Sequence, residues 1–206
     1  MKTVVLLSRK GGSGKSTIAT HLAVCADLDG KAAALLDIDP QGSATKWSKR
    51  RQADTPTVYP ATPVQVPNLL SKAKKQSADL IIIDTAGYAD AQANAALQLA
   101  DLVLIPCRAS VADLDAIDYT IEQARHLSRR SRAAVVLNAA PVRGKIVADV
   151  REALEKRVTV APVVLCQRAA YANAWIDGRA VQEYEPHGKA AAEIEQLYQW
   201  ILRDKK

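Results

Sequence analysis

Short apolar runs alternate with helical patterns along most of the chain. Residues 3–7 are mainly apolar, a glycine-containing polar loop follows, and residues 17–29 then carry apolar side chains at helical spacing. Residues 80–83 are all Leu or Ile and lead into Asp84, which is typical of a strand buried on both faces. The pattern predicts further strands at residues 32–38, 58–59, 102–105, 133–137 and 163–165, and further helices at residues 43–51, 69–76, 91–100, 112–127, 145–156 and 190–202.

This alternation predicts the fold class. Strands that alternate with helices usually form a parallel sheet with helices packed on both faces. We therefore expect an α/β fold in three layers, with a mostly parallel central sheet. No repeat, low-complexity tract or linker interrupts the pattern, so we expect a single domain over residues 1–206.

Composition narrows the class of protein. Hydrophobic residues make up 49% of the chain and charged residues 24%, which is ordinary for a soluble globular protein. No apolar run approaches the roughly 20 residues that span a bilayer, and no signal-peptide pattern precedes the first strand. Cys25, Cys107 and Cys166 are too few and too far apart to indicate a disulfide framework or a metal cluster. We expect a cytoplasmic protein.

A phosphate-binding loop lies between the first strand and the first helix. Glycines let backbone N–H groups turn toward phosphate oxygens, and the following helix points its N-terminus at the anion. A lysine then supplies a positive charge and a serine hydroxyl ligates magnesium. The motif predicts ATP with Mg²⁺ as ligands, bound by Lys10, Gly11, Gly12, Ser13, Gly14, Lys15, Ser16 and Thr17.

Acidic residues stand at the ends of two predicted strands, where ligands bind in open α/β sheets. Asp84 ends the apolar run 80–83, and a carboxylate there is expected to hold magnesium through water. Asp37 and Asp39 end the strand at residues 32–38, and one of the pair is placed to orient an attacking water. Asn138, at the end of the strand 133–137, is a candidate for hydrogen bonding to an adenine edge.

The net charge of +6 is concentrated in one stretch. Nine Lys or Arg and only three acids lie between residues 125 and 157, so this stretch alone carries an excess of six positive charges. Such a stretch is either a solvated basic face or a surface for nucleic-acid phosphates. The candidate DNA contacts are Arg129, Arg130, Arg132, Arg151 and Arg157.

Departures from the usual phosphate-loop pattern carry a family resemblance. The position five residues before Gly14, normally glycine, is Arg9, and Lys10 follows it. The resulting Lys-Gly-Gly-x-Gly-Lys-Ser-Thr resembles the deviant Walker A box of the ParA/MinD family. Residues 37–42 are similar to the switch I segment of that family, residues 79–87 to its Walker B and switch II segments, and residues 102–109 to the strand and turn that follow.

The resemblance implies a P-loop ATPase fold and specific roles. Lys10 would reach the phosphates of a second subunit in a nucleotide-sandwich homodimer, so Lys10, Lys15 and Asp39 are the expected catalytic residues. Asp39 would orient water, and Asp37 would support the magnesium or the dimer interface. Ser16, Asp39 and Asp84 are the expected magnesium ligands, and residues 164–168 would flank the base together with Asn138.

Three branches of the family compete. A short ParA-type partition or positioning ATPase lacks an N-terminal helix-turn-helix, and this chain starts at its first strand. A MinD-like membrane ATPase needs an apolar helical stripe beyond the core; Ile194, Leu197, Tyr198, Ile201 and Leu202 form a stripe that a helix docked on the core explains better. An iron–sulfur relative needs paired cysteines, and the sequence has no Cys-x-x-Cys.

The basic stretch favours the ParA-type branch. Nonspecific binding to duplex DNA rests on phosphate contacts rather than base readout. We expect a nucleoid-associated ATPase that works with a separately encoded ParB-like or cargo adaptor protein and does not bind membranes. Its cargo is a plasmid, a chromosome locus or a protein assembly, and the sequence does not choose among them.

Overall fold

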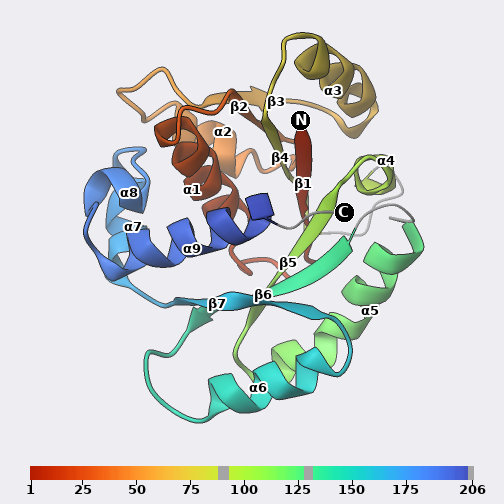
Figure 1. The fold of residues 1–206 in the computed structure, drawn as a ribbon, viewed down its shortest axis with the longest axis vertical. Helices are drawn as coiled ribbons and strands as arrows, with labels where there is room; N and C mark the ends of the chain where they lie inside the picture. The colour runs from red at the N-terminus through yellow and green to blue at the C-terminus, as the bar shows by residue number, and fades with distance from the viewer. Residues whose placement is uncertain (88–92, 128–131, 204–206) are drawn as a thin grey trace.

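A computed structural model of the chain describes residues 1–87, 93–127 and 132–203, with only the backbone described at residues 93 and 95. These residues form a sheet in the order β3-β2-β4-β1-β5-β6-β7 (Figure 1). All strand pairs among them are parallel. The strands are β1 (Lys2–Leu6), β2 (Ala33–Asp37), β3 (Thr57–Pro60), β4 (Leu80–Asp84), β5 (Leu102–Arg108), β6 (Arg132–Ala140) and β7 (Thr159–Cys166).

Helices cover both faces of this sheet, as the alternating pattern predicts. A 3₁₀ turn, η1 (Pro63–Gln65), precedes one of them. The helices are α1 (Lys15–Leu28), α2 (Ser43–Ser48), α3 (Val66–Lys75), α4 (Ala93–Gln98), α5 (Val111–Leu127), α6 (Ile146–Glu155), α7 (Ala169–Ile176), α8 (Val181–Tyr184) and α9 (Lys189–Arg203).

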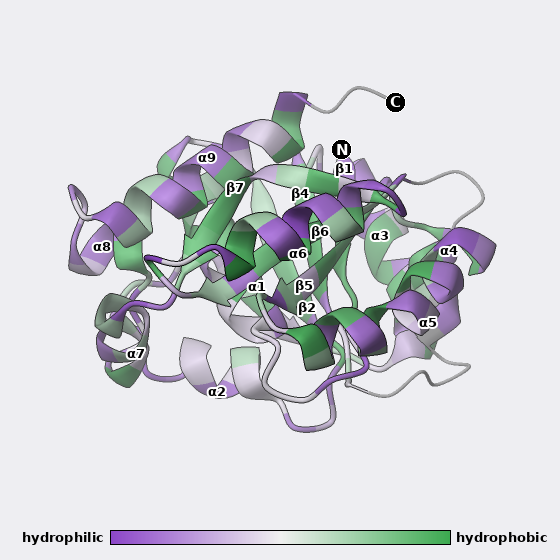
Figure 2. Ribbon diagram, turned by 90° about the horizontal axis from the view of Figure 1, so that it is seen from below, coloured by the Kyte–Doolittle hydropathy of each residue, from purple (hydrophilic) through white to green (hydrophobic). Residues whose placement is uncertain are grey.

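The core has two halves because successive strand residues face opposite sides of the sheet. In β1, Val4 and Leu6 belong to the half of the core that includes residues of α1 and α9, whereas Val5 belongs to the half that includes residues of α3, α4, α5 and α6. Figure 2 shows the hydrophobic strands at the centre and hydrophilic segments on the surrounding helices. The predicted three-layer α/β fold is confirmed.

Helix α9 resolves one of the sequence alternatives. Ile194, Leu197, Tyr198 and Ile201 are at most 1% exposed, and they pack against α1 and β7. The Tyr198 hydroxyl donates a hydrogen bond to Asp29 Oδ2. This apolar stripe is therefore part of the core, as predicted. Among the described helices, none combines the length and apolarity needed to cross a bilayer.

Strands β5 and β7 each contain a proline and are longer than the sequence pattern predicts. Strand β5 continues through Pro106 to Arg108. Its pairing with β1 ends at Leu104, so the N–H that Pro106 lacks costs no hydrogen bond to β1. Pro162 lies in edge strand β7, within an irregular part of its pairing with β6, where proline is tolerated. The prediction that β7 starts at residue 163 is therefore wrong.

Two further predictions around the last third of the chain need correction. Asn138 does not end its strand, because β6 runs on to Ala140. The hydrophobic pattern also predicts no helix between residues 165 and 190, where the structure has α7 and α8. Gly178 lies against the end of α2: a Cβ there would approach the Arg51 nitrogen to 2.5 Å.

Candidate nucleotide site

The predicted phosphate loop connects β1 to α1 at the carboxyl edge of the sheet. Gly12 and Gly14 adopt positive φ angles of 70° and 98°, which other residues rarely adopt. At Gly14 a Cβ would come within 2.1 Å of the Asn138 side-chain nitrogen, so no larger residue fits. Ser16 and Thr17 lie in the first turn of α1, where unpaired N–H groups and the helix dipole favour an anion.

Two side chains from neighbouring strands brace this loop. Asn138 Nδ2 donates a hydrogen bond of 2.7 Å to the carbonyl of Ser13. Arg108 Nη2 donates one of 2.8 Å to the carbonyl of Gly12. Asn138 therefore supports the loop backbone, and its expected contact with adenine stays a prediction. Arg108 carried no sequence signal, because its role depends on the adjacency of β5 and the loop.

Lys15 and Asp84 form the buried charged centre of the site. Lys15 is 6% exposed and Asp84 is 0% exposed. Burial raises the pKa of Asp84 to about 7, although the Ser16 hydroxyl and Lys15 oppose this shift. Burial also lowers the pKa of Lys15, against the attraction of Asp84 and Asp39.

The carboxylate of Asp84 fits a bound cation. Both of its oxygens are buried and have no hydrogen-bond partner among the described residues. An unpaired buried carboxylate is costly unless a cation or a hydrogen-bond donor compensates it. Oxygen ligands are the ones that Mg²⁺ prefers, and the Ser16 hydroxyl is close enough to act on the same carboxylate. Asp84 and Ser16 are thus suited to hold Mg²⁺ beside a nucleotide phosphate.

Asp37 and Asp39 have different environments although they lie two residues apart. Asp37 is 2% exposed and accepts hydrogen bonds from the Thr45 N–H at 2.8 Å and the Thr45 hydroxyl at 2.7 Å. It also accepts one from the Asp39 N–H. Asp37 therefore fixes the loop between β2 and α2, and its contacts are those of a structural residue. They give no support to its expected role at the magnesium or the interface.

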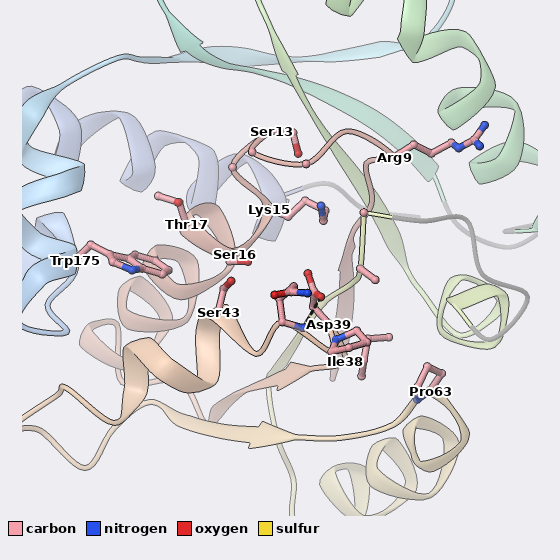
Figure 3. A pocket seen from close by; sticks show the side chains of 17 residues that line it. Arg9, Ser13, Lys15, Ser16, Thr17, Ile38, Asp39, Ser43, Pro63 and Trp175 are labelled. Carbon is pink, nitrogen blue, oxygen red and sulfur yellow. Dashed lines mark hydrogen bonds between the residues drawn. The ribbon is translucent and has the colours of Figure 1, made fainter.

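Asp39 belongs to the cavity of the site. Its Oδ1 accepts the Gln41 N–H at 2.9 Å, which holds the carboxylate in place. A cavity of about 640 Å³ is bounded by the phosphate loop, the β2–α2 segment, Pro63 and the segment after β4. Lys15, Ser16 and Asp39 line it, and Trp175 of α7 stands at one end beyond Thr17 (Figure 3).

Comparisons with known proteins place this site in a family. Residues 4–181 match the CobQ/CobB/MinD/ParA nucleotide binding domain family. The chain belongs to this family. The phosphate loop, Asp39 and Asp84 all lie within the matched residues, so the expected ParA/MinD-type ATPase is confirmed, and ATP with Mg²⁺ are the ligands that this class implies.

Individual relatives cover nearly the whole chain. Protein ParA of Rhizobium radiobacter is 28% identical over 95% of this chain and 92% of the relative. Maintenance of carboxysome distribution protein A of Gloeobacter kilaueensis is 29% identical over 98% of this chain and 93% of the relative. The structure of a Cyanothece McdA variant in complex with ATP is 18% identical, has a TM-score of 0.78, and matches 100% of this chain and 98% of that chain, which shows a shared fold.

The lysine expected to act across a ParA-type dimer does not line the nucleotide cavity in this ATPase. Lys10 lines a neighbouring cavity of about 350 Å³ against α5. Its Nζ lies 2.8 Å from Asp113 Oδ1. The expected contact of Lys10 with nucleotide phosphates therefore remains a prediction.

The candidate DNA contacts have unequal surroundings. Arg157 is paired with both oxygens of Asp118 at 2.9 and 3.0 Å. Arg151 donates to the carbonyl of Ala161 at 3.0 Å and contacts Glu155 at 3.3 Å. Arg132 is exposed, and its guanidinium lies 5.9 Å from the ring centroid of Trp200. Arg129 and Arg130 lie outside the described residues.

Proposed function

We propose that this ATPase binds Mg-ATP, forms an ATP-dependent homodimer, binds duplex DNA without sequence preference and uses hydrolysis to partition or position cargo. The observation that carries the proposal is the buried, unpaired Asp84 carboxylate beside Lys15 in a glycine-built phosphate loop. These groups are arranged to receive a phosphate–cation pair. Membership in a family that includes ParA proteins supports the partition or positioning role.

In this mechanism, the residues of the loop mainly bind and orient. The N–H groups of the loop and of the first turn of α1 hold the phosphates, and Lys15 contributes a fixed positive charge. Bound Mg²⁺, held by Ser16 and Asp84, would neutralise charge on the phosphate oxygens. Asp39 is placed to accept a hydrogen bond from water and orient it, with its own position held by the Gln41 N–H.

Trp175 gives the cavity a surface for the nucleobase. Among the described residues that line the cavity, Trp175 is the one with an aromatic side chain. This side chain is half-buried. Its ring centroid lies 6.1 Å from that of the fully buried Trp47, and its carbonyl accepts a hydrogen bond from Arg50, so the indole is well supported. Stacking on such a surface recognises the π face of a base rather than its edge.

The DNA-binding part of the proposal rests on the basic stretch at residues 125–157. Dimerisation would double its positive charge and therefore strengthen binding to DNA phosphates. Release after hydrolysis and stimulation by a ParB-like or cargo adaptor protein would complete a positioning cycle on the nucleoid. The MinD-like alternative loses support because the apolar residues of α9 pack in the core.

Sedimentation of the purified protein with Mg²⁺ and a non-hydrolysable ATP analogue, with ADP, or without nucleotide tests the proposal. We expect dimers only with the analogue, no nucleotide binding by Lys15→Ala, and binding without dimers by Lys10→Ala. The dimer should retain duplex DNA of any sequence, with affinity falling steeply as salt rises. The Arg129→Ala, Arg130→Ala double variant should bind DNA less tightly and ATP equally well. A monomer under all conditions, or a dimer that binds anionic vesicles and not DNA, would refute the proposal.

A further inference from the structure

Trp175 reaches the nucleotide cavity from a short helix. Helix α7 has eight residues, and a helix of that length is marginal unless other segments hold it. The last four carbonyls of any α-helix also lack an N–H partner within the helix. The place of Trp175 at one end of the cavity (Figure 3) therefore depends on what holds the C-terminal end of α7.

The segment at the end of α2 supplies these partners. Three of its side chains donate hydrogen bonds to backbone carbonyls at and just after the end of α7. Trp47 Nε1 donates to the Arg179 carbonyl at 3.2 Å, Arg50 Nη1 to the Trp175 carbonyl at 3.2 Å, and Arg51 Nη1 to the Gly178 carbonyl at 2.7 Å. Two of the three donors are cations, which the negative end of a helix dipole favours.

Arg51 is the centre of this junction. Its side chain is 3% exposed, and its two terminal nitrogens donate to the two carboxylate oxygens of Glu183 at 2.9 and 2.8 Å. Its Nε donates to the Thr55 carbonyl at 3.0 Å. Burial would raise the pKa of Glu183, but hydrogen bonds from Arg51 and the Ala180 N–H lower it, so the pair is ionised at neutral pH. A guanidinium can hold a carboxylate and two carbonyls at once, whereas an ammonium offers only three donors on a point charge.

The absence of a side chain at Gly178 lets α7 come this close. Gly178 is buried with φ 74°, and a Cβ there would meet the Arg51 nitrogen at 2.5 Å and the Trp47 carbonyl at 2.9 Å. Arg51 itself does not line the nucleotide cavity. Any effect of Arg51 on a bound nucleotide must therefore pass through another residue, and Trp175 lies on the helix that Arg51 holds.

We propose that Arg51, paired with Glu183, is a positioning residue that fixes Trp175 against α2 and so makes it a ready surface for the nucleoside. The inference deepens the proposed function and rests on the stacking of the base on Trp175. A ring that is fixed before binding loses less freedom when the base arrives, so the base binds more tightly. The phosphates, which the glycine loop holds, should not depend on Arg51.

Arg51→Lys tests the positioning role. Lysine keeps the charge beside Glu183 but cannot make the bidentate contact and hold the Gly178 carbonyl as well. ADP and inorganic pyrophosphate, each with Mg²⁺, are the probes, because the proposed function expects no dimer with ADP. Calorimetric titration should show ADP affinity about three- to tenfold weaker than in wild type and pyrophosphate affinity unchanged.

The matched control is Arg179→Lys, which changes the same residue type in the same junction. The Arg179 side chain pairs with Asp177 at 2.7 Å, and both side chains are more than 40% exposed. This variant should bind ADP and pyrophosphate as wild type does. Gly178→Ala gives a second route to the same effect, because its Cβ forces α7 away from α2 while Arg51 is kept. It should weaken ADP and not pyrophosphate.

A double variant distinguishes positioning from a general loss of structure. Trp175→Leu alone should weaken ADP and leave pyrophosphate unchanged. If Arg51 acts through Trp175, adding Arg51→Lys to Trp175→Leu should cause no further loss of ADP affinity.

Three results would overturn the positioning role. They are an equal loss of ADP and pyrophosphate affinity in Arg51→Lys, wild-type ADP affinity in Arg51→Lys and Gly178→Ala, and additive losses in the double variant. Wild-type ADP affinity in Trp175→Leu would instead refute stacking on Trp175 in the proposed function, and the positioning role with it.

Discussion

At the carboxyl edge of the sheet, Asp84 is fully buried, and its two oxygens have no hydrogen-bond partner among the described residues. Near the amino edge, by contrast, the exposed Arg157 donates hydrogen bonds to both oxygens of Asp118. The unpaired charge is thus the buried one. Burial without a partner costs free energy, and a bound ligand can return it. A paired surface charge costs little and offers less to a ligand. The difference indicates that a local excess of charge in a sequence does not by itself mark a binding site.

The largest effect should come from removing Asp39 at the carboxyl edge. Asp39→Ala should keep ATP binding and the dimer but slow phosphate release by about 100-fold, because oriented water contributes mainly in the transition state. The variant should accumulate as a long-lived DNA-bound dimer and coat the nucleoid in cells. ATP affinity, dimer fraction and phosphate release should be measured on the same preparation.

The exposed Asp54 supplies the control, and Asp54→Ala should behave as wild type. Weak ATP binding by a folded Asp39→Ala variant would indicate that Asp39 ligates magnesium instead. Phosphate release at the wild-type rate would refute its role with water.

Smaller effects should come from Asp84→Asn and Asp37→Asn. These two neighbouring substitutions should change the free energy of unfolding in opposite directions. Asp84→Asn removes a buried charge whose desolvation Lys15 and Ser16 only partly offset, so the ligand-free protein should gain about 1–2 kcal/mol in its free energy of unfolding at pH 8. ATP affinity should no longer respond to Mg²⁺. Asp37→Asn should lose about 1–3 kcal/mol because its carboxylate accepts three hydrogen bonds.

Denaturant unfolding and ATP titrations with and without Mg²⁺ measure both variants. A loss of stability in Asp84→Asn would show that its carboxylate is compensated within the protein. A wild-type response of ATP affinity to Mg²⁺ in that variant would remove Asp84 from the cation site.

The smallest effects should come from the paired arginines. Arg151→Ala should lower the free energy of unfolding by about 1 kcal/mol, since it joins α6 to the Ala161 carbonyl in β7. Arg157→Ala should lower it by about 0.5 kcal/mol. Each should reduce the salt dependence of DNA binding less than the Arg129→Ala, Arg130→Ala double variant does.

Lys156→Ala, which removes a charge whose ion pair with Glu152 is the more exposed one, is the control and should change stability less than Arg157→Ala does. The measurements are denaturant unfolding and DNA retention over a salt series. A larger loss of DNA binding in Arg157→Ala than in the double variant would show that pairing with Asp118 does not prevent a phosphate contact.

Local pattern was a good guide wherever local physics decides structure. The apolar run 80–83 predicts β4, and the glycines of residues 11–14 predict a loop of the kind that binds phosphate. Prediction failed at Pro106 and Pro162, because whether proline ends a strand depends on where the neighbouring strand stops. It also missed Arg108 and Trp175, which reach the site from β5 and α7.

The sequence by itself determined the order of strands and helices as far as β7, the phosphate loop and the family resemblance, because each rests on residue types at short spacing. Only the tertiary structure decided that Asp37 is a structural acceptor while Asp39 faces the cavity, and that Lys10 pairs with Asp113. Residue type sets which charges a chain carries. Burial and hydrogen-bond partners set what each charge can do, and these come from segments far apart in the sequence.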